Sequence, residues 1–111
     1  MGAPTEDDAK LASLSRLCGG PRDGALLRVS LANVYLGRAQ VDAAVVELRA
    51  ALGFDPDYSA AWKLLGKTLT ETDAAAARDA YRAGIDAATR RGDKQAVKEM
   101  AVFLRRLEKP V

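Results

Sequence analysis

Two parts of this sequence repeat the same pattern of residues, and this repetition is the feature that most constrains the fold. Leu31 matches Leu65 34 positions later, and Leu48 matches Tyr81 33 positions later. Further pairs with these offsets are Ala32 with Gly66, Ala51 with Gly84 and Leu52 with Ile85. A fixed period of this length is the signature of repeat proteins, in which each repeat is one small supersecondary unit. The chain should therefore contain two copies of one structural unit.

Helix-capping residues and helix breakers divide the chain into six expected helices. Thr5 and Asp8 form a plausible capping pair for the first helix, which Gly19 ends. Gly92 is a natural left-handed terminator for the fifth helix. The expected helices span about 6–18, 24–37, 41–53, 58–71, 74–91 and 94–108, with Asp23, Asp57 and Asp93 as caps of the second, fourth and sixth and Pro110 closing the chain. No segment alternates apolar and polar residues with a period of two, so we expect no sheet.

Apolar residues recur at helical spacing in these segments, which gives the helices apolar faces. Trp62, Leu65 and Leu69 share one face of the fourth helix. The last helix presents Val97, Met100, Phe103, Leu104 and Leu107. Such a face needs a neighbour, and short connections make consecutive helices antiparallel neighbours. We therefore expect an all-α fold of stacked helical hairpins, which at 111 residues forms a single domain, 1–111.

The repeated pattern resembles the tetratricopeptide repeat (TPR). In that family the first helix carries an aromatic residue, then Leu-Gly and a tyrosine. Small residues around a second aromatic residue, and then a proline, follow in and after the second helix. The residues that carry the resemblance are Leu31, Ala32, Tyr35, Ala44, Leu48, Ala51 and Pro56 in the first unit and Trp62, Leu65, Gly66, Ala77, Tyr81 and Gly84 in the second. Arg28 replaces the first aromatic residue of the first unit, and Leu69 replaces the tyrosine of the second.

The resemblance implies a TPR-like superhelical stack of antiparallel hairpins, similar to small stand-alone bacterial TPR proteins. TPR-like units are expected at 25–58 and 59–91, between an N-terminal helix at 6–18 and a C-terminal capping helix at 93–108. The small residues of the pattern should lie where paired helices cross, because larger side chains would push the backbones apart. Gly66 needs such a contact, since a glycine inside a helix costs about 1 kcal/mol relative to alanine.

The composition offers little that could support catalysis. The chain contains no histidine and one cysteine, Cys18. The most common general base and metal ligand is therefore absent, and a thiol–histidine dyad is excluded. The acidic run from Glu6 to Asp8 fits the first turn of a helix, where the helix dipole favours negative charge. We therefore expect a protein that is not an enzyme and that needs no cofactor or metal.

The sequence shows neither the pattern of a signal peptide nor an apolar run of about 20 residues. We therefore expect a cytoplasmic protein and no membrane partner.

In TPR proteins the first helix of each pair lines a concave surface that receives extended peptides or helices. The resemblance transfers this groove to Asn33, Lys63, Lys67, Lys98, Val29 and Leu64. The best-known groove of the family is a two-carboxylate clamp on the C-terminal tails of heat-shock chaperones, and Asn33 matches one clamp position. Val29 and Leu64 stand where that clamp has lysine and asparagine. What the resemblance implies is a mildly basic groove for an acidic or carboxylate-ended segment.

Two classes of function remain open. The first is an adaptor or scaffold that holds a protein or peptide segment in the groove. The second is weak nucleic-acid binding through the basic residues of the C-terminal part. These are Arg90, Arg91, Lys94, Lys98, Arg105, Arg106 and Lys109. Interleaved acidic residues and the lack of aromatic residues for base stacking favour the adaptor, and the net charge of +2 is too small to imply a polyanionic partner.

Overall fold

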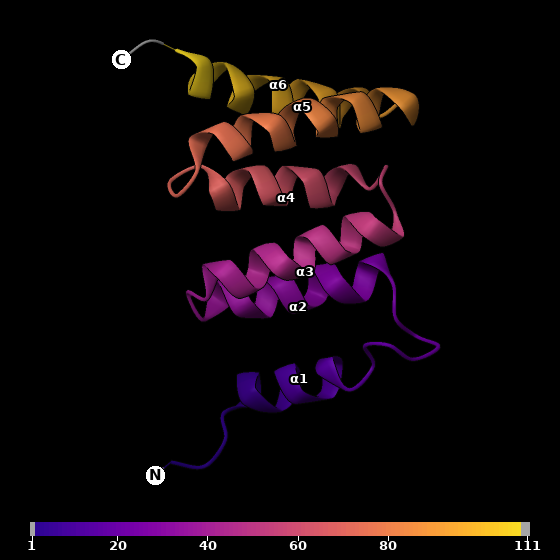
Figure 1. Ribbon diagram of the computed structural model, residues 1–111, viewed down its shortest axis with the longest axis vertical. Coiled ribbons are helices and arrows are strands. Elements are labelled where there is room, and N and C mark those ends of the chain that lie inside the picture. Colours follow the sequence, from indigo (N-terminus) through magenta and orange to yellow (C-terminus); the bar gives the residue numbers. More distant parts are fainter. Residues whose placement is uncertain (1, 110–111) are drawn as a thin grey trace. The chain divides into compact units, whose positions relative to one another are not determined.

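The computed structural model describes residues 2–109, which contain six helices and no strand (Figure 1). The helices are α1 (Glu6–Ser15), α2 (Ala25–Gly37), α3 (Val41–Phe54), α4 (Ser59–Leu69), α5 (Ala74–Arg90) and α6 (Lys94–Glu108). The chain divides into two compact units, Met1–Phe54 and Asp55–Val111. The all-helical fold that the sequence predicts is confirmed, whereas the closing role expected for Pro110 lies outside the described residues.

Several helix ends carry the capping contacts that the sequence predicts. The Thr5 hydroxyl accepts a hydrogen bond from the Asp8 backbone N–H at 3.1 Å, and the Asp8 carboxylate accepts one from the Thr5 N–H at 3.1 Å. At the start of α6 the Asp93 carboxylate accepts from the Ala96 N–H at 3.1 Å. Gly92 has a left-handed φ of 71° between α5 and α6. These contacts are confirmed, and they satisfy backbone groups that a helix cannot pair internally.

The prediction that Asp23 and Asp57 cap helices is wrong. The residues that precede α2 and α4 are Gly24 and Tyr58, and neither helix receives a side-chain cap from the described part of the chain. Both aspartates are held by arginine side chains instead. A guanidinium offers several N–H donors in one plane, and it competes effectively for the carboxylate oxygens that a cap would use.

Two turns of the first unit contain left-handed residues. α1 ends at Ser15, ahead of the predicted end at Cys18, because Leu17 and Cys18 form tighter turn hydrogen bonds before Gly19 adopts a φ of 81°. Between α2 and α3 the left-handed residue is Ala39, with a φ of 57°. This conformation is strained for a residue with a Cβ, so the turn is held against a local preference.

In the first unit, α2 and α3 lie side by side and α1 packs on α2 (Figure 1). The buried core of this unit consists of Leu27, Leu31, Ala32, Val34, Ala44, Leu48, Ala51 and Leu52. Ala32, Ala44 and Ala51 have no exposed surface. These small side chains let the α2 and α3 backbones approach, and the leucines fill the space on either side.

A network centred on Arg28 connects the segment before α2 to α3. Arg28 donates hydrogen bonds to Asp23 at 2.9 and 2.8 Å and to Glu47 at 3.1 Å. Its guanidinium also lies 5.9 Å from the centre of the Phe54 ring. Asp23 accepts a further hydrogen bond from the Gly19 N–H at 2.7 Å. The hydrogen bonds from Arg28, and then from Gly19, hold the pKa of Asp23 well below its ordinary value.

In the second unit, α5 packs against both α4 and α6. Its most buried cluster joins Tyr81 and Ala88 of α5 to Met100 of α6. The Tyr81 ring stacks on the Phe103 ring, with centroids 5.6 Å apart. The half-buried residues around the cluster are Trp62, Ile85, Ala96, Val97, Phe103, Leu104 and Leu107. α6 therefore covers the apolar face of the α4–α5 hairpin.

Two glycines make room for this cluster. A Cβ atom on Gly66 would lie 2.6 Å from carbons of the Tyr81 ring. A Cβ atom on Gly84 would lie 2.5 Å from the Met100 sulfur and 2.7 Å from the Trp62 Cβ. Carbon atoms in good contact lie about 3.5–4.0 Å apart. The second unit can therefore pack in this way only if both positions lack a side chain.

We expect Gly66→Ala to destabilise the protein by about 1–3 kcal/mol, because the added methyl group overlaps the ring of Tyr81, a buried residue. Thermal unfolding followed by circular dichroism measures the change. Gly53→Ala is the matched control: it also lies in a helix, and its Cβ would meet no described atom within 4 Å. The control should be neutral or up to about 1 kcal/mol more stable. Equal effects of the two substitutions would contradict the close contact.

Met100→Ala should destabilise the protein by about 2–5 kcal/mol, because it removes a thioether chain with 0% exposure and leaves a cavity under α6. Urea unfolding at 25 °C measures the loss. Val102→Ala, on the same helix at a side chain that is 42% exposed, should change stability by less than about 0.5 kcal/mol. A Met100 variant as stable as the Val102 variant would show that α6 does not cover this cluster.

Acid should destabilise the wild type more than Asp23→Asn. Because the pKa of Asp23 is lowered in the folded state, its contribution to stability is present above the ordinary aspartate pKa of about 4 and is lost as the pH falls below it. Urea midpoints at neutral pH and near pH 3 measure this difference. Asp79→Asn, whose carboxylate is 80% exposed, should respond to acid as the wild type does. An Asp23 variant with the wild-type response would exclude this linkage.

Candidate binding surface

Lys63 and Lys67, which the resemblance assigns to a groove, lie one turn apart on α4 and both contact α6. The Lys63 ammonium donates a hydrogen bond to Glu99 at 2.7 Å. The Lys67 ammonium lies 5.1 Å from the centre of the Phe103 ring. One α4 lysine is therefore paired with a carboxylate of α6, and the other lies over an aromatic face.

Glu99 is the acidic centre of this region. It accepts hydrogen bonds from Lys63 and, at 3.2 Å, from the Gln95 amide. These two hydrogen bonds, together with the charges of Lys63 and Lys67, lower the pKa of Glu99. Lys63 thus has an internal carboxylate partner, and any ligand carboxylate would compete with Glu99 for it.

Phe103 receives a second cation from its own helix. The Arg106 guanidinium lies 5.6 Å from the ring centre, while Tyr81 stacks on the same ring. A cation over an aromatic face contributes about 0.5–1 kcal/mol at an exposed site. The set formed by Lys63, Lys67, Glu99, Phe103 and Arg106 is called the α4/α6 surface below.

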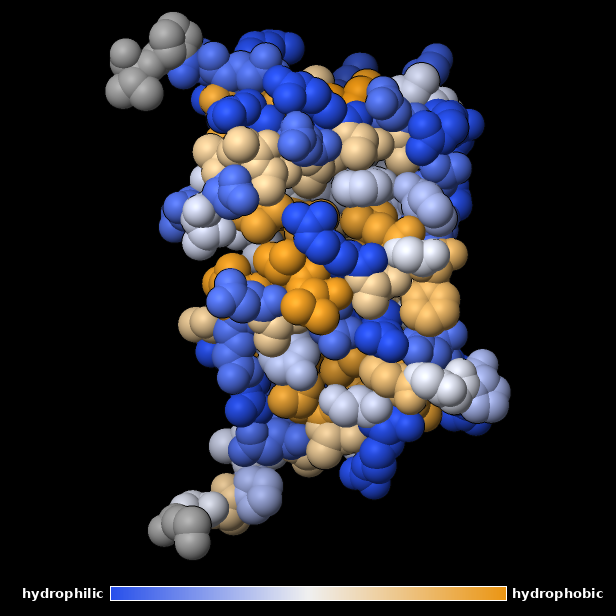
Figure 2. Space-filling model, in the orientation of Figure 1, coloured by the Kyte–Doolittle hydropathy of each residue, from blue (hydrophilic) through white to orange (hydrophobic). Residues whose placement is uncertain are grey.

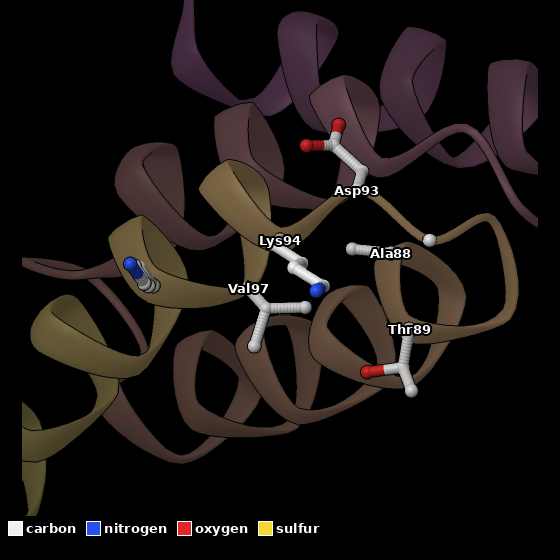
Figure 3. Close-up of a pocket in the computed structure, with 7 residues that line it drawn as sticks. Ala88, Thr89, Asp93, Lys94 and Val97 are labelled. Atoms are coloured by element: carbon white, nitrogen blue, oxygen red, sulfur yellow. The ribbon is translucent and has the colours of Figure 1, made fainter.

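Two of the lysines predicted for the groove, Lys63 and Lys98, line different cavities of the second unit. A cavity of about 150 Å³ adjoins the α4/α6 surface and is lined by Ser59, Ala60, Lys63, Asp93, Gln95, Ala96 and Glu99. Lys98 lines a different cavity of about 360 Å³ at the α5–α6 turn (Figure 3). The structure therefore brings Lys63 and Lys67 to one surface, while Lys98 lines a cavity whose lining includes neither of them.

The remaining predicted groove residues are Leu64, Val29 and Asn33. Leu64 is a half-buried residue of α4, and its carbonyl accepts a hydrogen bond from the Thr68 hydroxyl at 2.7 Å. Val29 and Asn33 belong to α2 in the first unit, where Val29 is half-buried and Asn33 is exposed. Their participation in a binding groove stays a prediction.

Most of the residues that carry the repeat pattern lie in the cores of the two units. The buried members are Leu31, Ala32, Ala44, Leu48 and Ala51 in the first unit and Leu65, Gly66, Ala77, Tyr81 and Gly84 in the second. Tyr35 is half-buried. Trp62 is half-buried as well, and its indole N–H donates to the carbonyl of exposed Pro56 at 2.7 Å. That hydrogen bond satisfies the polar edge of the indole while its rings pack inside.

On the face drawn in Figure 2, hydrophobic residues form small patches among hydrophilic ones. The large hydrophobic residues with the highest exposure are Leu26 (72%), Val46 (64%), Phe54 (53%) and Val102 (42%). Single exposed apolar residues are normal on protein surfaces, so none of them marks a site by itself.

Sequence reasoning did not assign Glu99, Phe103 and Arg106 to the candidate groove. The signal available was their position on one side of the last helix, at spacings of three and four residues. That spacing shows that they are neighbours, but only the packing of α6 on α4 pairs them with the two lysines.

Residues 2–109 contain no group of three or more histidine, cysteine or acidic side chains placed to hold a metal ion. In the same range, no helix combines the length and the apolar character that crossing a lipid bilayer requires.

Comparisons with known proteins identify the family. No protein-family model matches the sequence. The chain is 42% identical over 100 residues to TPR repeat-containing protein PA0015 of Pseudomonas aeruginosa, an alignment that covers 89% of this chain and 95% of that protein. It is 49% identical to protein BPP2914 of Bordetella parapertussis, whose solution structure superposes with a TM-score of 0.73 over 96% of this chain and 89% of the other. The chain therefore belongs to the TPR repeat-containing proteins.

Proposed function

We propose that this protein is a non-catalytic interaction module that binds an acidic or carboxylate-ended protein segment on the α4/α6 surface. The contact between Lys63 and Glu99, at 2.7 Å, carries the proposal. It is an internal example of the interaction that a ligand carboxylate would make. Membership of the TPR family supports a protein partner in general terms.

The α4/α6 surface combines cations with an aromatic ring. Lys67 and Arg106 both lie near the Phe103 ring, so a ligand could place a carboxylate between them and an apolar side chain against the ring edge. A hydrogen bond to a charged group contributes about 1.5–3 kcal/mol, and only a few such bonds are available. The affinity that this surface supports is therefore micromolar.

The proposal assigns no chemical step to the chain. With no histidine in 111 residues, the chain lacks the most common general base, and its one cysteine has no histidine to activate it. Binding alone is the activity that we propose.

Nucleic-acid binding through the C-terminal cations has less support. Arg90 pairs with Asp57 and Arg91 with Asp55 at 2.8 Å, so two of these cations already contact carboxylates of the same unit. A gel-shift series at increasing salt tests this alternative, because phosphate binding weakens steeply with salt.

Affinity capture from cells that naturally make the protein, followed by titration of the captured partner, tests the proposed surface. Lys67→Glu should weaken binding about tenfold, because it removes one attraction and adds one repulsion. Glu99→Gln should strengthen binding about two- to fivefold, because it frees Lys63 from its internal carboxylate.

Each variant has a control with the same change of charge. Lys10→Glu places the reversal on exposed α1, and Glu108→Gln removes a carboxylate elsewhere on α6, 3.8 Å from Arg82. Binding that responds equally to Lys67→Glu and Lys10→Glu would exclude the α4/α6 surface. Salt-sensitive gel shifts without protein capture would favour the nucleic-acid alternative.

A further inference from the structure

A cavity in the second unit lies where α5 ends and α6 begins (Figure 3). Its volume is about 360 Å³, which is within the range of small-ligand sites. The lining residues are Ala88, Thr89, Gly92, Asp93, Lys94, Val97 and Lys98. No residue of the α4/α6 surface is among them.

The floor of this cavity is apolar and belongs to the core of the second unit. Ala88 has no exposed surface and is part of the buried cluster with Tyr81 and Met100. Val97 packs against the same cluster. Gly92 contributes only backbone, in the left-handed conformation that ends α5. Ala88 itself is covered, so the apolar surface that a ligand can bury comes from the other lining residues, Val97 among them.

The mouth of the cavity carries two cations on one side of α6. Lys94 and Lys98 are one helical turn apart, and neither forms an ion pair with another residue in 2–109. Figure 3 shows the Lys94 side chain between Ala88 and Val97, with the Asp93 carboxylate pointing to the other side. That carboxylate caps α6 by accepting from the Ala96 N–H. Asp93 keeps its negative charge while it caps, so the cavity is bordered by two positive charges and one negative charge, a net of +1.

We propose that this cavity binds a small amphiphilic carboxylate, with an acyl chain on the apolar floor and the carboxylate between Lys94 and Lys98. An uncharged apolar molecule would fill the floor but leave the two ammonium groups without a partner. An inorganic anion would meet the lysines but leave the apolar floor in water. A medium-chain acyl carboxylate satisfies both halves of the site, by burial of apolar surface and by charge-assisted hydrogen bonds.

NMR titration of the ¹⁵N-labelled full chain with octanoate tests the proposal, because it detects weak binding and locates it. The amide signals of residues 88–98 should shift with one common dissociation constant. Butyrate should bind at least tenfold more weakly, since each methylene group that the cavity buries strengthens binding about fourfold. Octanol, which has the chain without the charge, should also bind more weakly than octanoate.

Two paired variants test the role of the lysines without disturbing the fold. Lys94→Gln with Lys98→Gln should weaken octanoate binding about tenfold. Arg105→Gln with Lys109→Gln makes the same change of net charge at the other end of α6 and should leave binding unchanged. All four side chains are exposed, so both variants should fold.

Three results would overturn the proposal. The first is a set of shifts spread over all basic residues, as expected for nonspecific association. The second is equal weakening by the two paired variants. The third is tighter binding of N-acetylleucine than of octanoate, which would assign the cavity to the C-terminal residue of a protein and not to an acyl chain. None of these results depends on the α4/α6 surface, whose test is separate.

Discussion

Close contact between the helices of the second unit is the constraint on which the rest of that unit depends. Gly66 of α4 leaves space for the Tyr81 ring, and Gly84 of α5 leaves space for Met100 and Trp62. Tyr81 can then stack on Phe103, which fixes the face that α6 turns towards its neighbours. In such a closely packed core, one added methyl group at either glycine would force the neighbouring side chains or backbones to shift. These two positions therefore affect where α6 lies.

The position of α6 explains why one helix contributes to two different surfaces. Gln95, Glu99 and Phe103 face α4, where they meet the two lysines of that helix. Lys94 and Lys98 border the cavity shared with α5. These sets are offset around the same helix, so one rigid packing arrangement presents a mixed-charge surface for a protein segment and a basic-rimmed apolar cavity.

Both units contain contacts between an aspartate and an arginine, but these contacts involve different positions of the repeat. In the first unit Arg28 stands where the second unit has Trp62, and it binds Asp23 and Glu47 while lying over Phe54. In the second unit Trp62 packs its rings against the core and uses its N–H on Pro56, while Asp57 is taken up by an arginine of α5. The two units therefore repeat the same helical hairpin, but α2 is fixed by ion pairs of Arg28 and α4 by the packing and hydrogen bond of Trp62. The Arg90–Asp57 pair is exposed and adds little stability by itself, whereas the Arg28 pairs are largely covered by neighbouring residues.

The sequence by itself determined the helices, the repeat and the residues of the two cores, because all of these follow from local periodicity and capping. The caps at Thr5 and Asp93 and the left-handed Gly92 were readable because each involves residues within a few positions of one another. The wrong predictions for Asp23 and Asp57 show the limit of this local reasoning. The residues next to an aspartate do not show whether its carboxylate will cap a helix or bind an arginine. The candidate site followed the same division: α4 and its lysines were predictable, but the pairing of Lys63 with Glu99 and the separate cavity of Lys98 were decided by tertiary structure. The Lys63–Glu99 contact joins residues more than 30 positions apart. Which side of α6 faces α4 depends on how Met100 and Phe103 pack against α5, and the sequence does not show this packing.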